Sequence, residues 1–224
     1  DLASTLASTA SPERFSERLA RNQLKQIDIC RVDYQTPTQK GTRIFVNNLG
    51  IGLEAAVVQR YEDVTWVQGH LRYLVAALQT IRTYQPTRLS AQWEHPLDHE
   101  AHQALPDSMR HDVLLHNDVT TLVTVGNNRR AGGGFYLTPD AILDNGLFDA
   151  GILRSVSRLN LLALLAQALQ GKHTSHQAIT MMRTPTLTIS CDDPLPVQAD
   201  GELLTNEAAK IAISVHTQPL QIYV

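Results

Sequence analysis

Residues 196–202 read Pro-Val-Gln-Ala-Asp-Gly-Glu, a strand-like run that ends in a sharp turn signal. Asp-Gly pairs supply the positive φ angles that a two-residue type I′ turn requires. A second strand-like run, residues 210–215, follows the turn. The stretch therefore predicts a β-hairpin that carries the carboxylates of Asp200 and Glu202 on the rim of a sheet. A purely structural turn explains the same spacing, so the pattern by itself leaves both interpretations open.

Strand patterns also dominate the rest of the chain. Runs of β-branched and apolar residues bounded by Gly, Pro and Asn predict strands at residues 42–48, 88–93, 112–116, 120–125, 148–156, 186–191 and 220–224. The runs at 112–116 and 120–125 flank Asn117-Asp118, a short turn signal that predicts a hairpin. Helices are predicted from Ser11-Pro12 to about residue 22, over 69–83 and from Ser157 to Gly171. We therefore expect an α+β protein, mainly an antiparallel β-sandwich domain with two or three helices.

The composition excludes several classes of protein. The 224 residues carry a formal net charge of −3, and their charges are mixed rather than gathered in a basic block, which argues against nucleic-acid binding. The most apolar stretch, residues 159–169, is too short to span a bilayer. The two cysteines, Cys30 and Cys191, are far apart in the sequence and indicate reduced thiols in a cytosolic protein.

Two turn-rich segments could bind a ligand. Residues 126–134 contain three successive glycines after two arginines, which could form a backbone anion site or simply a flexible turn. Residues 140–147 contain Asn145-Gly146, a strong turn signal whose oxygen atoms could bind Mg²⁺ or Ca²⁺. Each pattern is weak when taken alone.

Two other patterns are poor matches to known sites. Residues 50–55, Gly-Ile-Gly-Leu-Glu-Ala, fit the dinucleotide-binding fingerprint, but no second strand follows in the expected place, so we reject a Rossmann site. His95, His99 and His102 could share a helix face and bind zinc. Pro96 and the lack of an apolar stripe favour a solvated loop instead.

Taken in order, these pieces resemble the diacylglycerol kinase and sphingosine kinase superfamily, and its bacterial lipid kinases in particular. The resemblance covers nearly the whole chain and is weakest over residues 94–111. It rests on segments 1–6, 27–28, 45–47 with 50–55, 69–74, 126–134, 139–147, 171–173 and 200–202.

The resemblance implies a particular domain organisation. Such kinases have an α/β nucleotide-binding domain with a Gly-Gly-Asp-Gly-Thr loop, followed by a β-rich domain that faces the lipid. That loop does not occur in these 224 residues. We therefore expect residues 1–30 to be a remnant of the nucleotide-binding domain with a connecting helix. Residues 31–224 would form the β-rich domain of an inactive fragment, whose last strand packs toward the missing domain.

The resemblance also implies roles for the carboxylates of the predicted turn. Glu202 would be the base that deprotonates the lipid hydroxyl. Asp200 and Gly201 would lie beside the γ-phosphate of ATP and its Mg²⁺. Phosphoryl transfer needs positioning, charge neutralisation and a weak pull on the proton of the attacking hydroxyl, and a carboxylate can supply the last of these.

A second, structural Mg²⁺ in the family is held by main-chain oxygens and one carboxylate. The corresponding positions here are Ile142, Asn145 and Leu147. Asn145 stands where the family has the carboxylate, which leaves a neutral oxygen and weakens this expectation.

Sphingoid-base kinases carry an acidic residue where this chain has Ala56, so a neutral glycerolipid such as diacylglycerol is the expected acceptor. The helix at 159–169 could line an acyl channel or simply pack in the core. We expect a cytoplasmic enzyme of phospholipid metabolism that contacts the membrane peripherally and could form a homodimer. The alternatives are a non-catalytic lipid-binding or regulatory module of the same fold and, more remotely, a zinc hydrolase that uses the histidines at 95–102.

Overall fold

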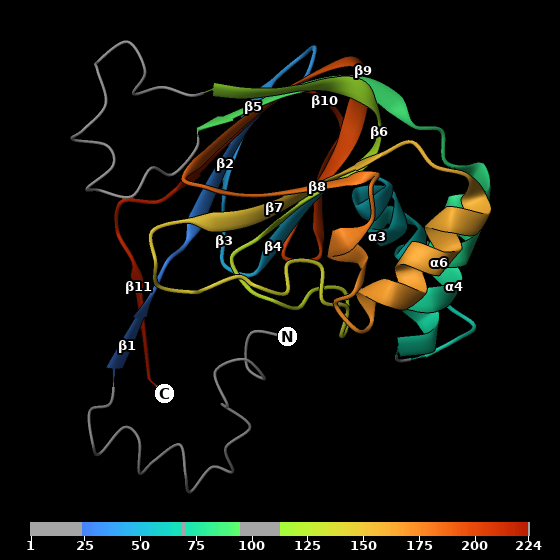
Figure 1. The fold of residues 1–224 in the computed structure, drawn as a ribbon, viewed down its shortest axis with the longest axis horizontal. Coiled ribbons are helices and arrows are strands. Elements are labelled where there is room, and N and C mark those ends of the chain that lie inside the picture. Colours follow the sequence, from blue (N-terminus) through green and yellow to red (C-terminus); the bar gives the residue numbers. More distant parts are fainter. Residues whose placement is uncertain (1–23, 69, 95–112, 224) are drawn as a thin grey trace, which may run out of the picture.

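The computed structural model describes residues 24–68, 70–94 and 113–223, and Figure 1 shows their arrangement. The strands are β1 (Leu24–Ile27), β2 (Cys30–Gln35), β3 (Lys40–Phe45), β4 (Asn48–Gly52), β5 (Thr87–Glu94), β6 (Val113–Gly126), β7 (Phe148–Arg154), β8 (Ile179–Thr184), β9 (Thr186–Ala199), β10 (Glu202–Val215) and β11 (Leu220–Tyr223). The helices are α3 (Leu53–Asp63), α4 (His70–Thr83), α6 (Arg158–Ala168) and the short 3₁₀ helix η2 (His173–Ser175).

Nine of these strands form one antiparallel sheet, which folds over itself. Its order is β3-β2-β10-β9-β4-β6-β7-β8, and β5 pairs with both β6 and β9. The long strands β6 and β9 therefore hold β4 at one end and β5 at the other. Register shifts in β10 and β6 let these strands bend from one layer to the next. The prediction of a mainly antiparallel, sandwich-like α+β domain is confirmed.

The main hydrophobic core lies between the layers of this sheet. Its largest fully buried side chains include Phe45, Phe148, Ile51 and Ile189, which come from four different strands. A second, smaller cluster joins the sheet to the helices through residues such as Leu53 and Leu161. The helices α3, α4 and α6 lie together on one side of the sheet (Figure 1).

Two of the three helices follow sequence signals. The Ser157 side chain accepts a hydrogen bond from the Asn160 backbone N–H and so caps the start of α6. Gly171, with φ of 70°, ends the turn that follows α6. The apolar period at 69–83 produces α4. None of the helices in the described ranges is long and apolar enough to cross a bilayer. The helix predicted at residues 12–22 lies outside the described residues.

The predicted hairpin at Asn117-Asp118 is wrong, because β6 runs through these residues without a turn. Residues 113–120 pair with β5, whereas residues 122–126 pair with β4 and β7. The change of partner occurs at an irregularity after Thr120, and the Asp118 side chain accepts the Val119 N–H. Asn117 and Asp118 therefore lie just before a bend, where β6 changes its pairing partner from β5 to β4 and β7. In the same way, β9 unites two strands that were predicted separately.

The prediction for residues 42–55 also needs correction. Gly50 lies within β4 and Gly52 is the last residue of that strand, whereas the predicted strand at 42–48 breaks between Phe45 and Asn48. The helix α3 begins directly after Gly52 and was not predicted. The rejection of a Rossmann site agrees with the topology, because β4 pairs only antiparallel with its neighbours.

A separate two-stranded ribbon pairs β1 with β11, from Leu24 opposite Tyr223 to Ile27 opposite Leu220. It extends away from the main sheet in Figure 1. The predicted last strand therefore exists, and its partner is the first described strand. Packing of this strand toward another domain, and a boundary at residue 30, stay predictions.

Candidate functional site

The predicted Asp-Gly turn joins the two longest neighbouring strands of the sheet. Asp200 and Gly201 have φ angles of 51° and 86°, and Glu202 pairs directly with Ala199. Positive φ at both central residues is the conformation of a type I′ turn. Asp200 is the only non-glycine residue with positive φ in the described part of the chain. The turn is therefore of the predicted kind, and its aspartate occupies a conformation that glycine adopts more easily.

The Asp200 carboxylate binds the backbone of a second turn. It accepts hydrogen bonds from the N–H groups of Val46 at 2.8 Å, Asn47 at 2.8 Å and Asn48 at 3.0 Å. The Asp200 N–H in turn donates to the Asn48 carbonyl at 2.8 Å. Asp200 thus anchors the hairpin to the connection between β3 and β4. A role for Asp200 and Gly201 beside a nucleotide stays a prediction.

Glu202 extends from the same turn into solvent. Its side chain is 69% exposed and forms an ion pair with Arg43 of β3. Ion pairs this exposed contribute little free energy, about 0–1 kcal/mol, so the carboxylate can leave Arg43 easily. The structure places an available carboxylate on the rim, as the sequence indicated, and a role as base stays a prediction.

A cleft of about 430 Å³, whose wall combines several polar side chains with apolar surface, opens beside this turn. We call it the polar cleft; it is lined by Asn47, Asn48, Glu54, Val58, Tyr61, Tyr73, Gly132, Gly133, Gln198, Asp200 and Gly201. The glycine-rich segment thus reaches the cleft through its backbone. Its arginines do not line the cleft: Arg129 donates to the Ala141 carbonyl, and Arg130 stacks on Tyr136. The anion site predicted for this segment would therefore rest on backbone N–H groups alone.

The loop at 142–147 uses its side-chain oxygens internally. The Asn145 amide oxygen accepts the Leu147 N–H at 3.1 Å, and the Asp28 carboxylate accepts the Gly146 N–H at 2.7 Å. Asp144 pairs with Lys25 at 3.2 Å. For a Mg²⁺ ion, the loop side chains thus offer the amide oxygen of Asn145, which already accepts a hydrogen bond, and the carboxylate of Asp144, which is already in an ion pair. These side chains fit a Mg²⁺ site poorly. A metal held by Ile142, Asn145 and Leu147 stays a prediction, and nothing below depends on it.

A second space, an apolar cavity of about 100 Å³, lies between the helices and the sheet. Most of its wall is aliphatic or aromatic, and it includes Leu161, Leu164 and Leu165 of α6. Leucines of this helix thus line an internal cavity while also packing in the smaller core. Glu54 and Tyr73 line both this apolar cavity and the polar cleft.

Glu54 is the residue that the sequence analysis missed. It is 7% exposed, and its Oε1 accepts from Asn48 Nδ2 at 2.6 Å and from Gln198 Nε2 at 3.1 Å. Burial raises the pKa of Glu54 to about 7, although the nearby Thr124, Asn48 and Gln198 side chains favour the charged form. An acidic residue inside the apolar segment 50–55 was the available signal. The fingerprint interpretation of that segment drew attention to its glycines instead.

The zinc prediction at His95, His99 and His102 lies outside the described residues. Within the described ranges, no group of three or more His, Cys, Asp or Glu side chains is arranged to hold a metal ion. The groups that do come together are the turn at 200–202, the 46–48 connection, the glycine-rich segment and Glu54.

Comparison with known proteins gives a consistent result. Residues 47–224 match the family model described as "YegS C-terminal NAD kinase beta sandwich-like domain". The chain is 24% identical over 204 residues to a diacylglycerol kinase of Mycobacterium tuberculosis, covering 91% of this chain and 59% of that protein. It is 33% identical over 182 residues to a "Probable lipid kinase YegS-like" of Pseudomonas aeruginosa, covering 81% of this chain and 53% of that protein.

Solved structures show the same fold. A protein from Bacillus anthracis str. Sterne aligns with a TM-score of 0.59 at 17% identity, covering 93% of this chain and 59% of that one. Another structure from that strain, described as a diacylglycerol kinase, aligns with a TM-score of 0.53 at 13% identity, covering 93% and 57%. The chain thus spans little more than half the length of the relatives it matches.

We predict that Asp200→Ala destabilises the domain by about 1–2 kcal/mol, because three backbone N–H groups lose a charged acceptor. Urea unfolding followed by circular dichroism measures the change. Asp192→Ala, at an exposed position in β9, is the matched control and should shift stability by less than about 0.5 kcal/mol. Equal stabilities of the two variants would contradict the anchoring role.

Glu54 also predicts a pH dependence of stability. Its pKa rises from 4.5 in the unfolded chain to about 7 in the fold, so the folded state binds the extra proton between these values. The resulting stabilisation is fully present below about pH 4.5 and is lost as pH rises to about 7, by an amount on the order of 2 kcal/mol. Urea unfolding between pH 5 and 8 should show this contribution as the difference between the wild type and Glu54→Gln. The lowered pKa values of His116 and His173 add a slope of opposite sign in both proteins. The exposed control Glu207→Gln should leave the pH dependence of stability unchanged. An unchanged pH dependence in Glu54→Gln would refute the raised pKa of Glu54.

Proposed function

Because this chain belongs to the family of YegS C-terminal NAD kinase beta sandwich-like domains, whose relatives are named lipid and diacylglycerol kinases, we propose that it is the substrate-side domain of an ATP-dependent lipid kinase. The acceptor would be the hydroxyl of diacylglycerol or a related glycerolipid. The observation that carries this proposal is the exposed carboxylate of Glu202, held by a rigid two-residue turn beside the polar cleft.

Glu202 would act as the general base of the reaction. The lipid hydroxyl oxygen forms a bond to the γ-phosphorus of ATP, the bond from that phosphorus to the leaving oxygen of ADP breaks, and the hydroxyl proton passes to Glu202. The carboxylate first has to leave Arg43, which an exposed ion pair allows at little cost. ATP with Mg²⁺ would supply the phosphoryl group and neutralise its charge.

Asp200 and Gly201 would position the base rather than react themselves. The Asp200 carboxylate is occupied by three backbone N–H groups, and the Gly201 N–H donates to the Gln198 side chain at 2.9 Å. These contacts fix the direction in which Glu202 leaves the turn. Fixed geometry contributes strongly to phosphoryl transfer, because the reaction depends mainly on alignment of the reactants.

The nucleotide would be held by another domain. The polar cleft has no Lys or Arg in its wall, so in the described part of the chain it lacks the cations that usually bind triphosphate. The matched relatives extend well beyond the region that this chain covers. A nucleotide-binding domain that faces the turn at 200–202 would complete the site, and this chain alone would be inactive.

The apolar cavity would receive the start of an acyl chain. Its aliphatic wall suits methylene groups, and it meets the polar cleft at Glu54 and Tyr73. A volume of about 100 Å³ holds only part of a chain, so the remainder would leave between α4 and α6 toward the outer surface.

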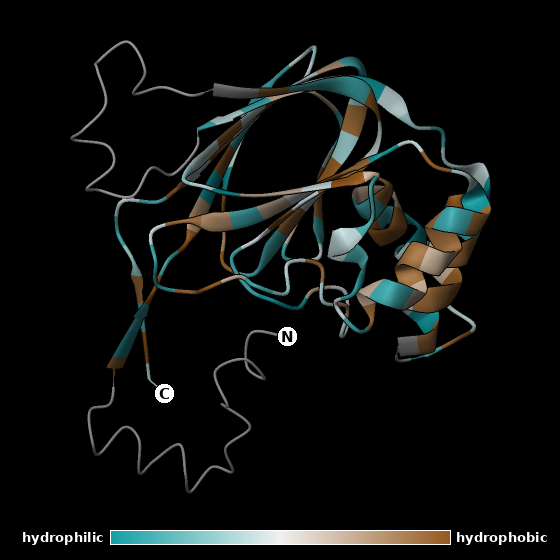
Figure 2. Ribbon diagram, viewed as in Figure 1, coloured by the Kyte–Doolittle hydropathy of each residue, from teal (hydrophilic) through white to brown (hydrophobic). Residues whose placement is uncertain are grey.

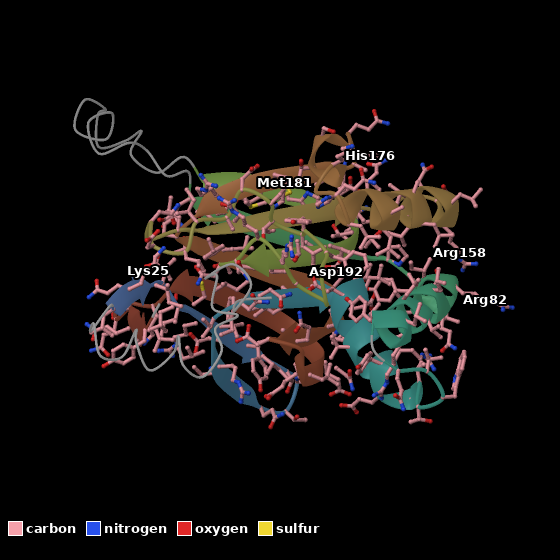
Figure 3. The ribbon with its side chains drawn as sticks, turned by 90° about the horizontal axis from the view of Figure 1, so that it is seen from below. Lys25, Arg82, Arg158, His176, Met181 and Asp192 are labelled. Carbon is pink, nitrogen blue, oxygen red and sulfur yellow. The ribbon has the colours of Figure 1, made fainter. Side chains whose placement is uncertain are left out.

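The outer surface of these helices is suited to a bilayer. Figure 2 shows hydrophobic residues along α4 and α6, and the leucines Leu71 and Leu159 are 64% and 79% exposed. Trp66, in the connection before α4, is 72% exposed. Arg82 and Arg158 extend from the ends of the same helices (Figure 3), where they could meet anionic headgroups. We propose that this surface docks on the membrane from which the lipid enters.

Glu202→Gln should lower turnover of the intact enzyme at least about 100-fold, because the side chain can no longer accept a proton. The assay follows transfer of label from ATP to dioctanoylglycerol by the full gene product. Glu207→Gln, a second exposed glutamate of β10, serves as the control and should keep normal turnover. Full activity of the Glu202 variant would favour a lipid-binding module without catalysis.

The double variant Leu71→Gln/Leu159→Gln should weaken co-sedimentation with vesicles of phosphatidylcholine and phosphatidylglycerol at least about 10-fold, because two exposed apolar side chains are lost. Leu115→Gln is the matched control, since this leucine is 70% exposed but lies on β6 in the segment that pairs with β5, on the sheet rather than on the helices. Equal binding of both variants would exclude this surface as the docking site.

A further inference from the structure

Among the described residues, three buried polar atoms in the wall of the apolar cavity have no hydrogen-bond partner within 3.5 Å. They are Glu54 Oε2, Thr124 Oγ1 and His173 Nδ1. The three residues are 7%, 4% and 7% exposed, so bulk water does not form hydrogen bonds with these atoms. Leaving such a group unpaired in an apolar space costs about 1–3 kcal/mol, and buried polar groups are therefore normally paired. A ligand that carries a polar group into the cavity would pair these atoms.

Two of these atoms, Glu54 Oε2 and Thr124 Oγ1, lie together: Thr124 is near enough to favour the charged form of Glu54, although no hydrogen bond within 3.5 Å joins the two side chains. Thr124 pairs with Gly50 across the β4–β6 ladder, and the Glu54 side chain lies against Gly50. Oε1 of Glu54 already accepts two amide N–H groups, so a proton on the neutral carboxyl belongs on Oε2. Oε2–H and the Thr124 hydroxyl would then present two donors to the same place. His173 differs, because its Nε2 faces the Leu137 carbonyl and its Nδ1 is left as an acceptor.

The electrostatic surroundings favour a neutral ligand group over a charged one. Neither space has a Lys or Arg in its wall within the described residues, so an anionic group would lack a counter-charge. Burial lowers the pKa of His173, which keeps it neutral, and burial and the nearby Glu54 raise the pKa of Tyr73, which keeps its hydroxyl protonated. Asp200 is the other carboxylate on the polar cleft, and backbone N–H groups occupy it. An ammonium group needs several acceptors, whereas the neutral Glu54 carboxyl and the Thr124 hydroxyl offer donors.

We propose that Glu54 is a specificity-determining residue of the kinase reaction: its neutral carboxyl, with the Thr124 hydroxyl, donates a hydrogen bond to the ester carbonyl of the acceptor lipid. This inference rests on the proposed function. In a glycerolipid the hydroxyl, the ester carbonyl and the acyl chain follow one another along the molecule. In this chain the 200–202 turn, Glu54 and the apolar cavity follow one another in the same order. In the part of the chain that the structure describes, only Glu54 and Tyr73 line both spaces, and Glu54 Oε2 has no hydrogen-bond partner within 3.5 Å.

The comparison of an ester lipid with its ether analogue tests this contact. Isothermal titration calorimetry measures binding of 1,2-dioctanoylglycerol and 1,2-di-O-octylglycerol to the chain at pH 6 and pH 8. The ester should bind about 10-fold more tightly at pH 6, where Glu54 is mostly protonated, because only the ester has the carbonyl acceptor. This preference should fall at least about threefold at pH 8, where the carboxylate no longer donates.

Glu54→Gln separates the hydrogen bond from the charge. The amide keeps a donor at all pH values, so this variant should retain the preference for the ester at pH 6 and at pH 8. Thr124→Val, which removes the second donor, should reduce the preference, and Glu207→Gln should behave as the wild type. Thermal unfolding of each variant verifies that it folds, and the wild-type comparison of the two lipids needs no variant.

Equal affinities for the ester and the ether at pH 6 would overturn the role of Glu54 while leaving lipid binding by the domain intact. A preference that does not change between pH 6 and pH 8 would also overturn it, as would loss of the preference in Glu54→Gln. Failure of both lipids to bind would overturn this inference and the proposed lipid acceptor together. Full turnover in Glu202→Gln would instead count against the catalytic proposal alone.

Discussion

The contact between the Asp200 carboxylate and the backbone of residues 46–48 determines the geometry of the whole candidate site. It joins two turns that are about 150 residues apart in the sequence, and each turn ends a strand of the sheet. The same junction places Asn48 and Gln198 where both amides reach Glu54. The exposed Glu202 and the buried Glu54 are therefore oriented by one common anchor. One carboxylate is exposed to water, and the other is buried, which raises its pKa.

Sequence reasoning succeeded where the determining forces are local. The Asp-Gly turn, the Ser157 cap and the apolar period of α4 depend on a few neighbouring residues, and all three occur as predicted. Sequence reasoning failed where contacts between residues far apart in the sequence determine the structure. Asn117-Asp118 is a turn signal that lies within β6, because pairing with β5 keeps the strand extended there.

The same distinction between local and distant contacts applies to the candidate site. The rim position of the 200–202 turn followed from its residues, but the partners of Asp200 and Glu202 come from β3 and the connection after it, which no local pattern reveals. Glu54 was missed because its importance arises from burial between α3, the sheet and two cavities. Residue type shows which groups can donate or accept a proton, and only the fold shows which of them lack water.

The ribbon of β1 and β11 has a mechanical consequence. Leu24 and Tyr223 are paired neighbours at its open end, so both ends of the described chain leave the domain at one point. A force that separates these ends would break the four residue pairs one after another, starting from Leu24 and Tyr223, instead of breaking them all at once. The nine-stranded sheet would carry no load until Ile27 and Leu220 part. The ribbon would thus open before the nine-stranded sheet bears tension.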